Sequence, residues 1–464
     1  MGKRKIISSC VFCLSYRVKI FYKNPAKEGR KRMSAILKRK VLHLDVQFVS
    51  PISVSSGEDE WTDSDLLRDY DGTPFISGTS LAGAMRAYLE KEKKDKCLMG
   101  YSDNENDGKM SSLFVSDMTF TDKVKTAVRD GVSLNENKTS ITGSKFDMEI
   151  LEAKAKAEFY LELVIREDDD ENQIEQELSM IFNGINSGEI RLGSKKTRGF
   201  GRFKILSIAS QTYEKENYLD YANAYKKATW DAQKNELEEW LKKKEWTPKQ
   251  VHVQIPLRLK GGISIRQYAA KKGEPDYTQI LDHGVPVIPG SSFAGAIRHR
   301  AKEILEELDQ SGLKLPEEVT DIMHTAFGFV KETNANTSQI IIGETEIKGA
   351  KPLTMVRTGV SRFESAVKRG ALYKETTYVD GTLMLDIAVR KDEEWSQEKW
   401  ILGLLLLVIK DLQNGLLAVG GETAIGRGIF SENGLILIDG EANKEDEFIS
   451  NMIQNLERNG GINQ

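Results

Sequence analysis

Two acidic loops contain the residues of this sequence that are best suited to catalysis. Each loop precedes a helix that is expected to begin at a glycine. When the loops are aligned on that glycine, Asp63 and Asp69 of the first face Asp276 and Asp282 of the second within one residue. A carboxylate in such a loop can hold a hydrated divalent metal ion or accept the proton of an attacking hydroxyl group. A solvated surface loop is the simpler interpretation, and composition alone favours it.

Closely spaced glycines and cations form a second group of candidate functional residues. Between Arg191 and Lys204 the sequence has six cations and no acid, although the formal net charge of the chain is −4. Glycine permits positive φ values and close approach of a ligand, so this stretch predicts a loop that binds phosphate or RNA. Its candidate RNA-binding residues are Lys195, Lys196, Arg198, Gly199, Gly201 and Arg202.

A related glycine-rich stretch occurs at residues 420–430. It keeps several glycines and Arg427, which is a further candidate RNA contact, but it has lost most of the lysines and contains Glu422. We therefore expect this second loop to bind nucleic acid more weakly or in a different way.

The expected helices behind the two aspartates begin in similar segments, PFISGTSLAGAMR (74–86) and PVIPGSSFAGAIR (286–298). A helix that is entered through glycine presents free N–H groups and the positive end of its dipole, which suit phosphate. Ser291 or Ser292 is expected to cap the second helix. Tight helix–sheet packing by glycine and alanine is the alternative, and for one segment alone we favour it. The candidate RNA contacts here are Ser80, Arg86, Ser292 and Arg298.

The similarity of these segments reveals an internal duplication. Eight of the thirteen positions in the two helix entries are identical at an offset of 212, and TRGFGRF (197–203) matches AIGRGIF (424–430) in the same order. Such collinear matches indicate two homologous domains in tandem. The expected organisation is an N-terminal extension (1–35), a first copy (36–211), a helical connector (212–250), a second copy (251–440) and a polar C-terminal tail (441–464).

Each copy must position its loops on strands and helices. Both open on a strand with apolar alternation, at residues 40–50 and 251–259, and two helices and a few further strands follow. This β-first order predicts an α+β fold in which helices cover one face of an antiparallel sheet. The other face would be free for a ligand, as in sheets that recognise RNA.

Length and composition restrict the class of protein. A chain of 464 residues with 39% hydrophobic and 29% charged residues fits two or three globular domains. Three cysteines are too few for a disulfide framework and indicate a cytoplasmic setting. Cys10 and Cys13 have C-x-x-C spacing without a second pair, which disfavours a metal site. No segment predicts a membrane span, and Met33 is a possible start of translation.

These motifs together resemble the RAMP (repeat-associated mysterious protein) superfamily, and within it the backbone subunits of type III CRISPR effector complexes. A tandem (double) backbone subunit like those of type III-D systems is the most similar arrangement. The resemblance extends over residues 40–440 of both copies. It is carried by the two helix entries, AFGF (326–329), VRDGVSL (128–134) with VRTGVSR (356–362), and GSKKTRGFGRF (193–203) with GGETAIGRGIF (420–430).

The resemblance implies two ferredoxin-like (RRM-like) RAMP domains, each with a β-hairpin thumb, expected near residues 134–150 and 362–377. It implies an endoribonuclease that binds guide RNA and cleaves target RNA at regularly spaced sites. By motif position, Asp63 matches the catalytic aspartate of related subunits, and Asp276 is its counterpart in a loop less like the family pattern. The RNA's own 2′-hydroxyl would attack in line, with a divalent metal, Mg²⁺ or Mn²⁺, held indirectly at Asp63 and Asp276.

The partners that the resemblance implies are guide (CRISPR) RNA, target RNA and other CRISPR effector subunits, including further RAMP proteins and a large polymerase-like subunit. Two alternatives remain open. The first alternative to a cleaving subunit is a non-catalytic RNA-binding scaffold of the same fold. The less favoured one is a stand-alone guide-processing endoribonuclease that acts through His283 or His299.

Overall fold

The structure is a computed structural model of the chain. Most of the expected N-terminal extension, including Cys10, Cys13 and Met33, lies outside the residues that it describes. The described residues are 34–55, 62–91, 95–102, 108–135, 139–230, 233–268, 275–331, 334–391 and 400–459.

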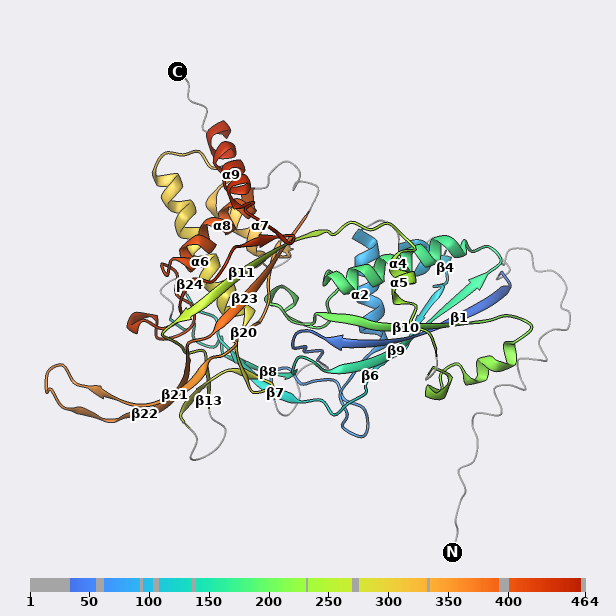
Figure 1. Cartoon of the computed structure of the whole chain (residues 1–464), viewed down its shortest axis with the longest axis horizontal. Helices are drawn as coiled ribbons and strands as arrows, with labels where there is room; N and C mark the ends of the chain where they lie inside the picture. The colour runs from blue at the N-terminus through green and yellow to red at the C-terminus, as the bar shows by residue number, and fades with distance from the viewer. Residues whose placement is uncertain are drawn as a thin grey trace, which may run out of the picture.

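The first copy is built on an antiparallel sheet with two main helices on one face (Figure 1). Its central strand is β1 (Ile36–Phe48), which pairs with β10 (Phe203–Tyr213) on one side and β9 (Lys156–Arg166) on the other. Two short strands pair with the far edge of β9. The remaining elements are β2 (Phe75–Ile76), α2 (Gly78–Lys91), α3 (Asp95–Leu98), β3 (Tyr101–Ser102), β4 (Gly108–Lys109), β5 (Leu113–Val115), β6 (Met118–Phe120), β7 (Thr126–Gly131), β8 (Phe146–Leu151), α4 (Glu171–Ser187) and η2 (Lys196–Arg198).

The second copy repeats this strand order. Its central strand β11 (Gln250–Lys260) pairs with β24 (Ile429–Glu432) on one side and β23 (Thr382–Arg390) on the other. The short strand β19 (Ile340–Ile342) pairs with the far edge of β23. Its other elements are β12 (Gly262–Ile263), β13 (Arg266–Tyr268), β14 (Tyr277–Gln279), β15 (Leu281–Asp282), β16 (Val285–Ile288), α6 (Gly290–Gln310), α7 (Val319–Phe327), β17 (Phe329–Lys331), β18 (Asn334–Asn336), β20 (Thr345–Glu346), β21 (Lys351–Val360), β22 (Val367–Val379), α8 (Trp400–Gln413), η5 (Thr423–Ile425), β25 (Leu437–Ile438) and β26 (Glu441–Ala442).

Alternating side chains on the central strands form the two cores. Leu42, Leu44 and Val46 of β1 are fully buried under α2 and α4, because successive residues of a strand point to opposite faces. Val253 and Ile255 of β11 are buried in the corresponding core of the second copy. The fold is therefore α+β with two tandem ferredoxin-like domains, which confirms the fold predicted from the sequence.

Two glycines establish that the duplication extends to the backbone. Gly201 and Gly428 have φ values of +74° and +69°, and a Cβ at either would overlap a carbonyl oxygen, that of Leu192 or of Val419. The same carbonyl-to-amide bonds close both turns, since Leu192 N donates to the Gly201 carbonyl and Val419 N to the Gly428 carbonyl. Only glycine fits such a position.

The connector differs from the expected helical segment and changes the surface of the first copy. It forms short helical turns, and its buried Trp230 packs with Val41 and Tyr213 on the sheet face opposite α2 and α4. The prediction of a free ligand-binding sheet face is therefore wrong for the first copy, because connector aromatic residues cover it. The turns are η3 (Tyr218–Asn223), η4 (Lys227–Thr229) and α5 (Leu237–Leu241).

The C-terminal residues also differ from the sequence interpretation. Residues expected to be a polar tail form β26 and the amphipathic helix α9 (Glu445–Asn459). Phe448, Met452 and Leu456 of α9 are buried against the core of the second copy. The spacing of these three residues by four positions places them on one helix face, a signal that polar composition masked.

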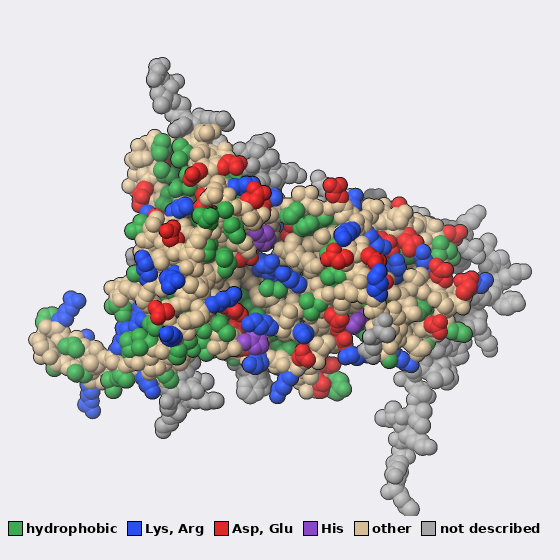
Figure 2. Space-filling view, in the orientation of Figure 1, with side chains coloured by type: hydrophobic (Ala, Val, Ile, Leu, Met, Phe, Trp, Pro, Cys, Tyr) green, Lys and Arg blue, Asp and Glu red, His purple; other side chains and the backbone are tan. Residues whose placement is uncertain are grey.

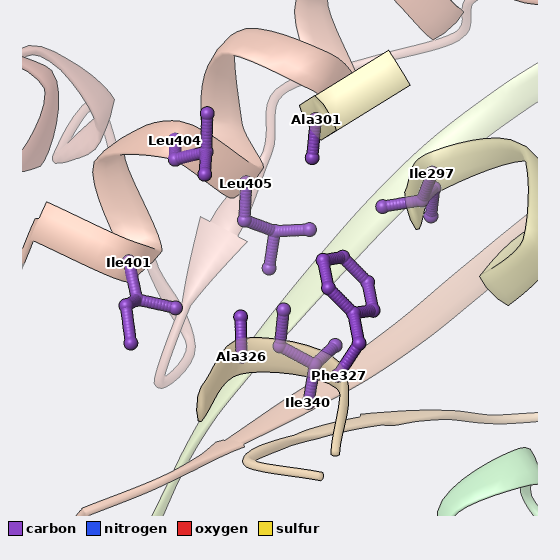
Figure 3. A pocket seen from close by; sticks show the side chains of 8 residues that line it. All are labelled: Ile297, Ala301, Ala326, Phe327, Ile340, Ile401, Leu404 and Leu405. Atoms are coloured by element: carbon purple, nitrogen blue, oxygen red, sulfur yellow. The ribbon is translucent and has the colours of Figure 1, made fainter. Parts of the chain in front are cut away.

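A small gap in the core of the second copy is not a ligand site. Its volume is about 10 Å³, enough for at most one water molecule, and its lining is wholly apolar (Figure 3). No helix among the described residues is long and apolar enough to cross a membrane.

Candidate functional site

In the first copy, Asp63 lies beside the β7–β8 hairpin, at the end of the paired strands that is nearer the tip, where Asp147 pairs with Asp130. The backbone N–H of Asp147 on β8 donates to Asp63 Oδ2 at 2.9 Å, and the N–H of Asp63 donates to Asp147 Oδ1 at 3.0 Å. Asp63 is exposed and Asp147 is half-buried. The reciprocal bonds fix the loop against the hairpin and bring two carboxylates together at the surface.

Asp276 occupies the corresponding place in the second copy. Its Oδ2 accepts the backbone N–H of Lys374 on β22 at 2.7 Å, and its side chain is exposed. Lys374 corresponds to Asp147 when residues are counted from the inner end of the second hairpin strand. Asp147 lies four residues before Leu151, which pairs with Ile52 just after β1. Lys374 likewise lies four residues before Tyr378, which pairs with Ile263 just after β11. The pairing within the hairpins differs, because Asp147 pairs with Asp130, whereas Lys374 pairs with Val356, the match of Val128.

These two loops offer few metal ligands of their own. Asp63 has the neighbouring Asp147 carboxylate, whereas Asp276 has beside it the backbone of Lys374. Neither aspartate belongs to a group of three close ligand atoms within the described part of the chain. A hydrated Mg²⁺ usually keeps several waters and takes one or two carboxylates with substrate phosphates, so the residues fit an indirectly held ion.

The hairpins beside the aspartates differ in length and surroundings. The β21–β22 hairpin projects away from the second copy (Figure 1) and exposes apolar side chains, with Phe363 fully exposed in the segment between the strands. The β7–β8 hairpin lies against the second copy, where Gln267 Nε2 donates to the Val128 carbonyl at 3.2 Å. Both hairpins begin earlier than the expected thumb ranges, which cover only their tips and second strands.

The glycine-rich loop of the first copy lies at the contact between the copies. A Cβ on Gly199 would come within 2.6 Å of the Glu344 backbone nitrogen, and one on Gly290 would overlap the Arg198 carbonyl. Arg202 Nη1 donates to Asp386 Oδ2 of β23 at 3.0 Å. Gly199 and Arg202 thus join the two copies, a use that the sequence could not reveal because the contacting residues are far apart in the chain.

A buried charge cluster strengthens this contact. The guanidinium group of Arg129 on β7 binds the Glu344 carboxylate through both terminal nitrogens, and Asp282 lies 4.0 Å away. Burial raises the pKa of Asp282 above its ordinary value, and the charge of Arg129 opposes this effect. His283 contacts the Ala153 carbonyl at the same junction, so this ring has a structural contact rather than an open position.

Basic side chains from both copies gather near the junction (Figure 2). Burial and the positive charges of Arg390 and Lys196 lower the pKa of Lys91. Burial and Arg390 likewise lower the pKa of Lys196. Among the described residues, none of these three cations forms an ion pair within 4.0 Å, and the charge of Glu189 only partly offsets the lowering of the Lys91 pKa. Cations that repel one another without bound acids favour an anionic ligand.

Other predicted cations lie close to this group. Burial lowers the pKa of Lys195 to about 8, and its ammonium lies 3.7 Å above the centre of the Phe146 ring. Burial and the charge of Arg298 lower the pKa of Arg198. The structure therefore brings Arg198 near Arg298, two candidates that the sequence placed in separate motifs of different copies. Lys91 and Arg390 were missed by the sequence analysis because each begins a run of mixed charge, KEKKDK (91–96) and RKDEE (390–394), which is typical of solvated surface.

The remaining predicted RNA contacts are engaged within the protein. Arg86 donates to the carbonyls of Met99 and Gly100 at 2.7 and 3.1 Å. Ser80 Oγ lies 2.9 Å from Ser77 Oγ. Arg427 is buried, with its Nε 3.7 Å from Glu422 Oε2. These side chains stabilise loops in the structure as it stands.

The helix entries follow the packing alternative. Gly78 N donates to Asp117 Oδ1 at 2.7 Å, so a carboxylate already occupies the first N–H of α2. The expected cap by Ser291 or Ser292 is wrong, because α6 begins at Gly290 and both serines lie in its first turn. Pro289 precedes the helix, and the Ser292 N–H donates to its carbonyl at 2.9 Å.

The family model described as the RAMP superfamily matches residues 45–204 and 256–431, one region in each copy. A search of curated proteins finds no match.

Proposed function

The chain belongs to the RAMP superfamily, and from that premise we propose that it is a backbone subunit of a type III CRISPR effector complex that holds guide RNA and cleaves target RNA at two sites. The family indicates a CRISPR-associated RNA-binding subunit that has guide RNA and other effector subunits as partners. The type III role, the cleavage and the catalytic residues are the proposal.

The observation that carries this proposal is the equivalent placement of two aspartates. Asp63 and Asp276 are both exposed, and each accepts a backbone N–H from the second strand of the adjacent hairpin. Two loops of different sequence each accept this bond from the second hairpin strand, four residues before that strand pairs with the segment that follows the first strand of its copy. A surface loop without function requires no such agreement, whereas two copies of one cleavage site do.

The proposed reaction is an intramolecular transesterification of the target strand. The 2′-oxygen of one nucleotide forms a bond to the adjacent phosphorus, and the bond from phosphorus to the 5′-oxygen breaks. The products are a 2′,3′-cyclic phosphate and a 5′-hydroxyl end. The carboxylate of Asp63 or Asp276 takes the 2′-hydroxyl proton directly or through water, and water protonates the leaving oxygen. Hairpin side chains would hold the nucleotide in line.

The proposed divalent ion would be held by the same residues. Asp63 with Asp147, and Asp276 alone, would hold a hydrated Mg²⁺ or Mn²⁺ together with substrate phosphates. When bound, the ion supplies positive charge that stabilises the charge developing on the phosphate oxygens.

Guide RNA is proposed to cross the junction between the copies. Lys91, Lys196 and Arg390 offer positive charge there and form no close ion pair among the described residues, while the charge of Glu189 also acts on Lys91. Lys195, Arg198 and Arg298 extend the same surface. Backbone phosphates are the ligands that such a group attracts without regard to base sequence, as a subunit that accepts many guides requires.

Further RAMP proteins fit the two ends of the chain. The copies meet through unlike surfaces, with the loop at Gly199 against the backbone at Gly343. The counterpart of Gly199 in the second copy, Gly426, has no atom within 4 Å of a built Cβ, and the counterpart of Glu344 in the first copy, Asp117, is exposed. An interface between unlike surfaces can add further units at both ends.

The test is cleavage of a complementary target RNA by the assembled complex. We expect Asp63→Ala to abolish one cut and Asp276→Ala to abolish another, each by about a hundredfold or more, because proton transfer contributes about 10²–10⁴ to rate. A single 2′-deoxy substitution at either cut position should remove that cut alone.

The matched controls are acids that lie outside the proposed sites. Asp71 is exposed in the same loop region as Asp63 and accepts the Thr73 N–H at 2.9 Å, and Asp309 is exposed at the end of α6. Asp71→Ala and Asp309→Ala should leave both cuts intact. Cuts that persist in the Asp63→Ala, Asp276→Ala double variant would assign the chain to the non-catalytic scaffold.

A further inference from the structure

A second group of possible metal ligands lies on the sheet face of the first copy, away from the proposed cleavage loops. His43 and Asp45 are alternate residues of β1, and Glu158 on β9 pairs directly with Asp45. The ligand atoms of the three side chains all lie within 4.8 Å of one another, with His43 Nε2 3.2 Å from Glu158 Oε2. Adjacent strands of a sheet therefore present one imidazole and two carboxylates together.

The arrangement is electrostatically unfavourable without a cation. Asp45 and Glu158 are like charges directly opposite each other on neighbouring strands, which destabilises a sheet. Burial raises the pKa of the nearby Tyr160, and the negative charges of Glu158 and Asp45 raise it further. Lys234 lies nearby, but it is paired with Glu239. A bound divalent ion would remove the repulsion.

Neighbouring groups hold the candidate ligands in position. Ser207 Oγ on β10 donates to Asp45 Oδ2 at 2.6 Å. The His43 ring lies 5.7 Å from Trp230 at an interplanar angle of 25° and 4.9 Å from the ring of Tyr160. Such outer contacts orient ligands in metal sites. The register irregularity between Asp45 and Val46 also lies here, where bulges often redirect side chains.

The three side chains also face a cavity. A hollow of about 430 Å³ between the sheet and the connector is lined by all three, together with polar side chains that include Lys227, Gln233 and Asn235. Water or an anion could therefore reach an ion held by the protein. Three protein ligands beside an accessible position are the composition of open zinc sites.

We propose that His43, Asp45 and Glu158 bind one divalent transition-metal ion, Zn²⁺ in preference to Mg²⁺, with an open coordination position toward the cavity beneath the connector. The imidazole nitrogen selects against Mg²⁺, which prefers oxygen ligands. The ion replaces the His43–Glu158 hydrogen bond and holds β1 to β9 under the connector. The site is independent of the RNA chemistry, because none of its ligands belongs to the loops of Asp63 or Asp276.

The experiment measures metal binding by the purified full-length chain. Titration with Zn²⁺ in a calorimeter is expected to show one ion bound through these residues, and Co²⁺ as a substitute is expected to give visible d–d absorption bands. Mg²⁺ should not compete. His43→Gln and Asp45→Asn should abolish this binding, and Ser207→Ala should weaken it by about tenfold.

Control variants separate this site from other sources of binding. His299→Gln removes a histidine that pairs with Glu303 on α6 and should leave the binding unchanged. The Cys10→Ser, Cys13→Ser double variant tests the cysteine pair. Zn²⁺ should raise the melting temperature of the native chain but not that of His43→Gln, while the two metal-free chains have similar circular dichroism spectra. No Zn²⁺ binding, or binding that survives His43→Gln and Asp45→Asn, would overturn the proposal.

Discussion

Gly199 and Gly426 show how one residue type serves different purposes in two copies of a fold. Both have positive φ values, +95° and +84°, and both end the short helical turn of their loop. Gly199 also lets the first copy approach the backbone at Glu344 of the second, whereas Gly426 is exposed. The local backbone conformation therefore preserves the glycine, and the inter-copy contact is an additional use of it.

The close approach of backbone at a second turn glycine, Gly201, can be tested separately from its positive φ value. Gly201→Ala should destabilise the first copy by about 3 kcal/mol or more, because a side chain is strained at φ +74° and would overlap the Leu192 carbonyl. Gly143→Ala is the matched control, since its φ is +77° but no atom lies within 4 Å, and it should cost only about 1 kcal/mol. The measurement is the urea midpoint of the first unfolding transition. Equal midpoints for the two variants would contradict the assigned overlap.

The sequence was informative about those site residues that occur in both copies. Asp63 and Asp276 could be aligned because the glycine downstream is shared, and their matching contacts are the structural counterpart of that alignment. Lys91 and Arg390 could not be found in this way, because they come from the end of α2 and the end of β23. Only the folded contact between copies brings their charges together.

At the scale of elements, the strands and main helices could be predicted and the covering segments could not. The alternation in β1 and β11 identifies half-buried strands without reference to the rest of the chain. The connector is different because its Tyr and Trp residues have helical spacing, yet they pack as a cover on the sheet. Tertiary contacts with Val41 and Tyr160, rather than local propensity, decide its conformation.

Helix α9 provides a prediction at this scale. Met452 is buried against α8, and Met452→Ala should lower the free energy of unfolding of the second copy by about 2–4 kcal/mol. Its neighbour Ile453 is 46% exposed, so Ile453→Ala should change that free energy by less than about 1 kcal/mol. Denaturant unfolding followed by circular dichroism distinguishes them. Similar small effects for both variants would contradict the packing of α9 on the second copy and would favour a polar tail.

At the scale of the whole molecule, the two copies form one unit through unlike surfaces. Arg129 of the first copy binds Glu344 of the second, and Arg202 binds Asp386. Gly199 lies against the backbone that leads to Glu344. Duplication could be predicted from repeated letters, but the relative placement of the copies could not. It depends on ion pairs such as Arg202–Asp386, whose partners are 184 residues apart.

The placement of the two copies determines where the proposed cleavage loops and the proposed RNA-binding group lie. The equivalent aspartate loops repeat once along the chain, beside one hairpin in each copy. The basic group at the junction lies between elements of both copies, from α2 and η2 of the first to β23 of the second. A single RNA strand held at the junction would thus be presented to two similar modules.

The central claim, that the paired modules bind RNA through the junction, is tested most directly by fluorescence anisotropy of labelled single-stranded RNA. The purified chain is titrated over a range of salt concentrations, with a triple variant (Lys91→Ala, Lys196→Ala, Arg390→Ala) and a matched triple variant of surface lysines that pair with acids (Lys242→Ala, Lys302→Ala, Lys444→Ala). The native chain and the surface variant should bind RNA alike. The junction variant should bind more weakly. The slope of the logarithm of its binding constant against the logarithm of the salt concentration should be smaller in magnitude by about 0.7 for each RNA phosphate that the protein no longer neutralises. A native chain without RNA affinity, or a junction variant with the native affinity and slope, would contradict the account.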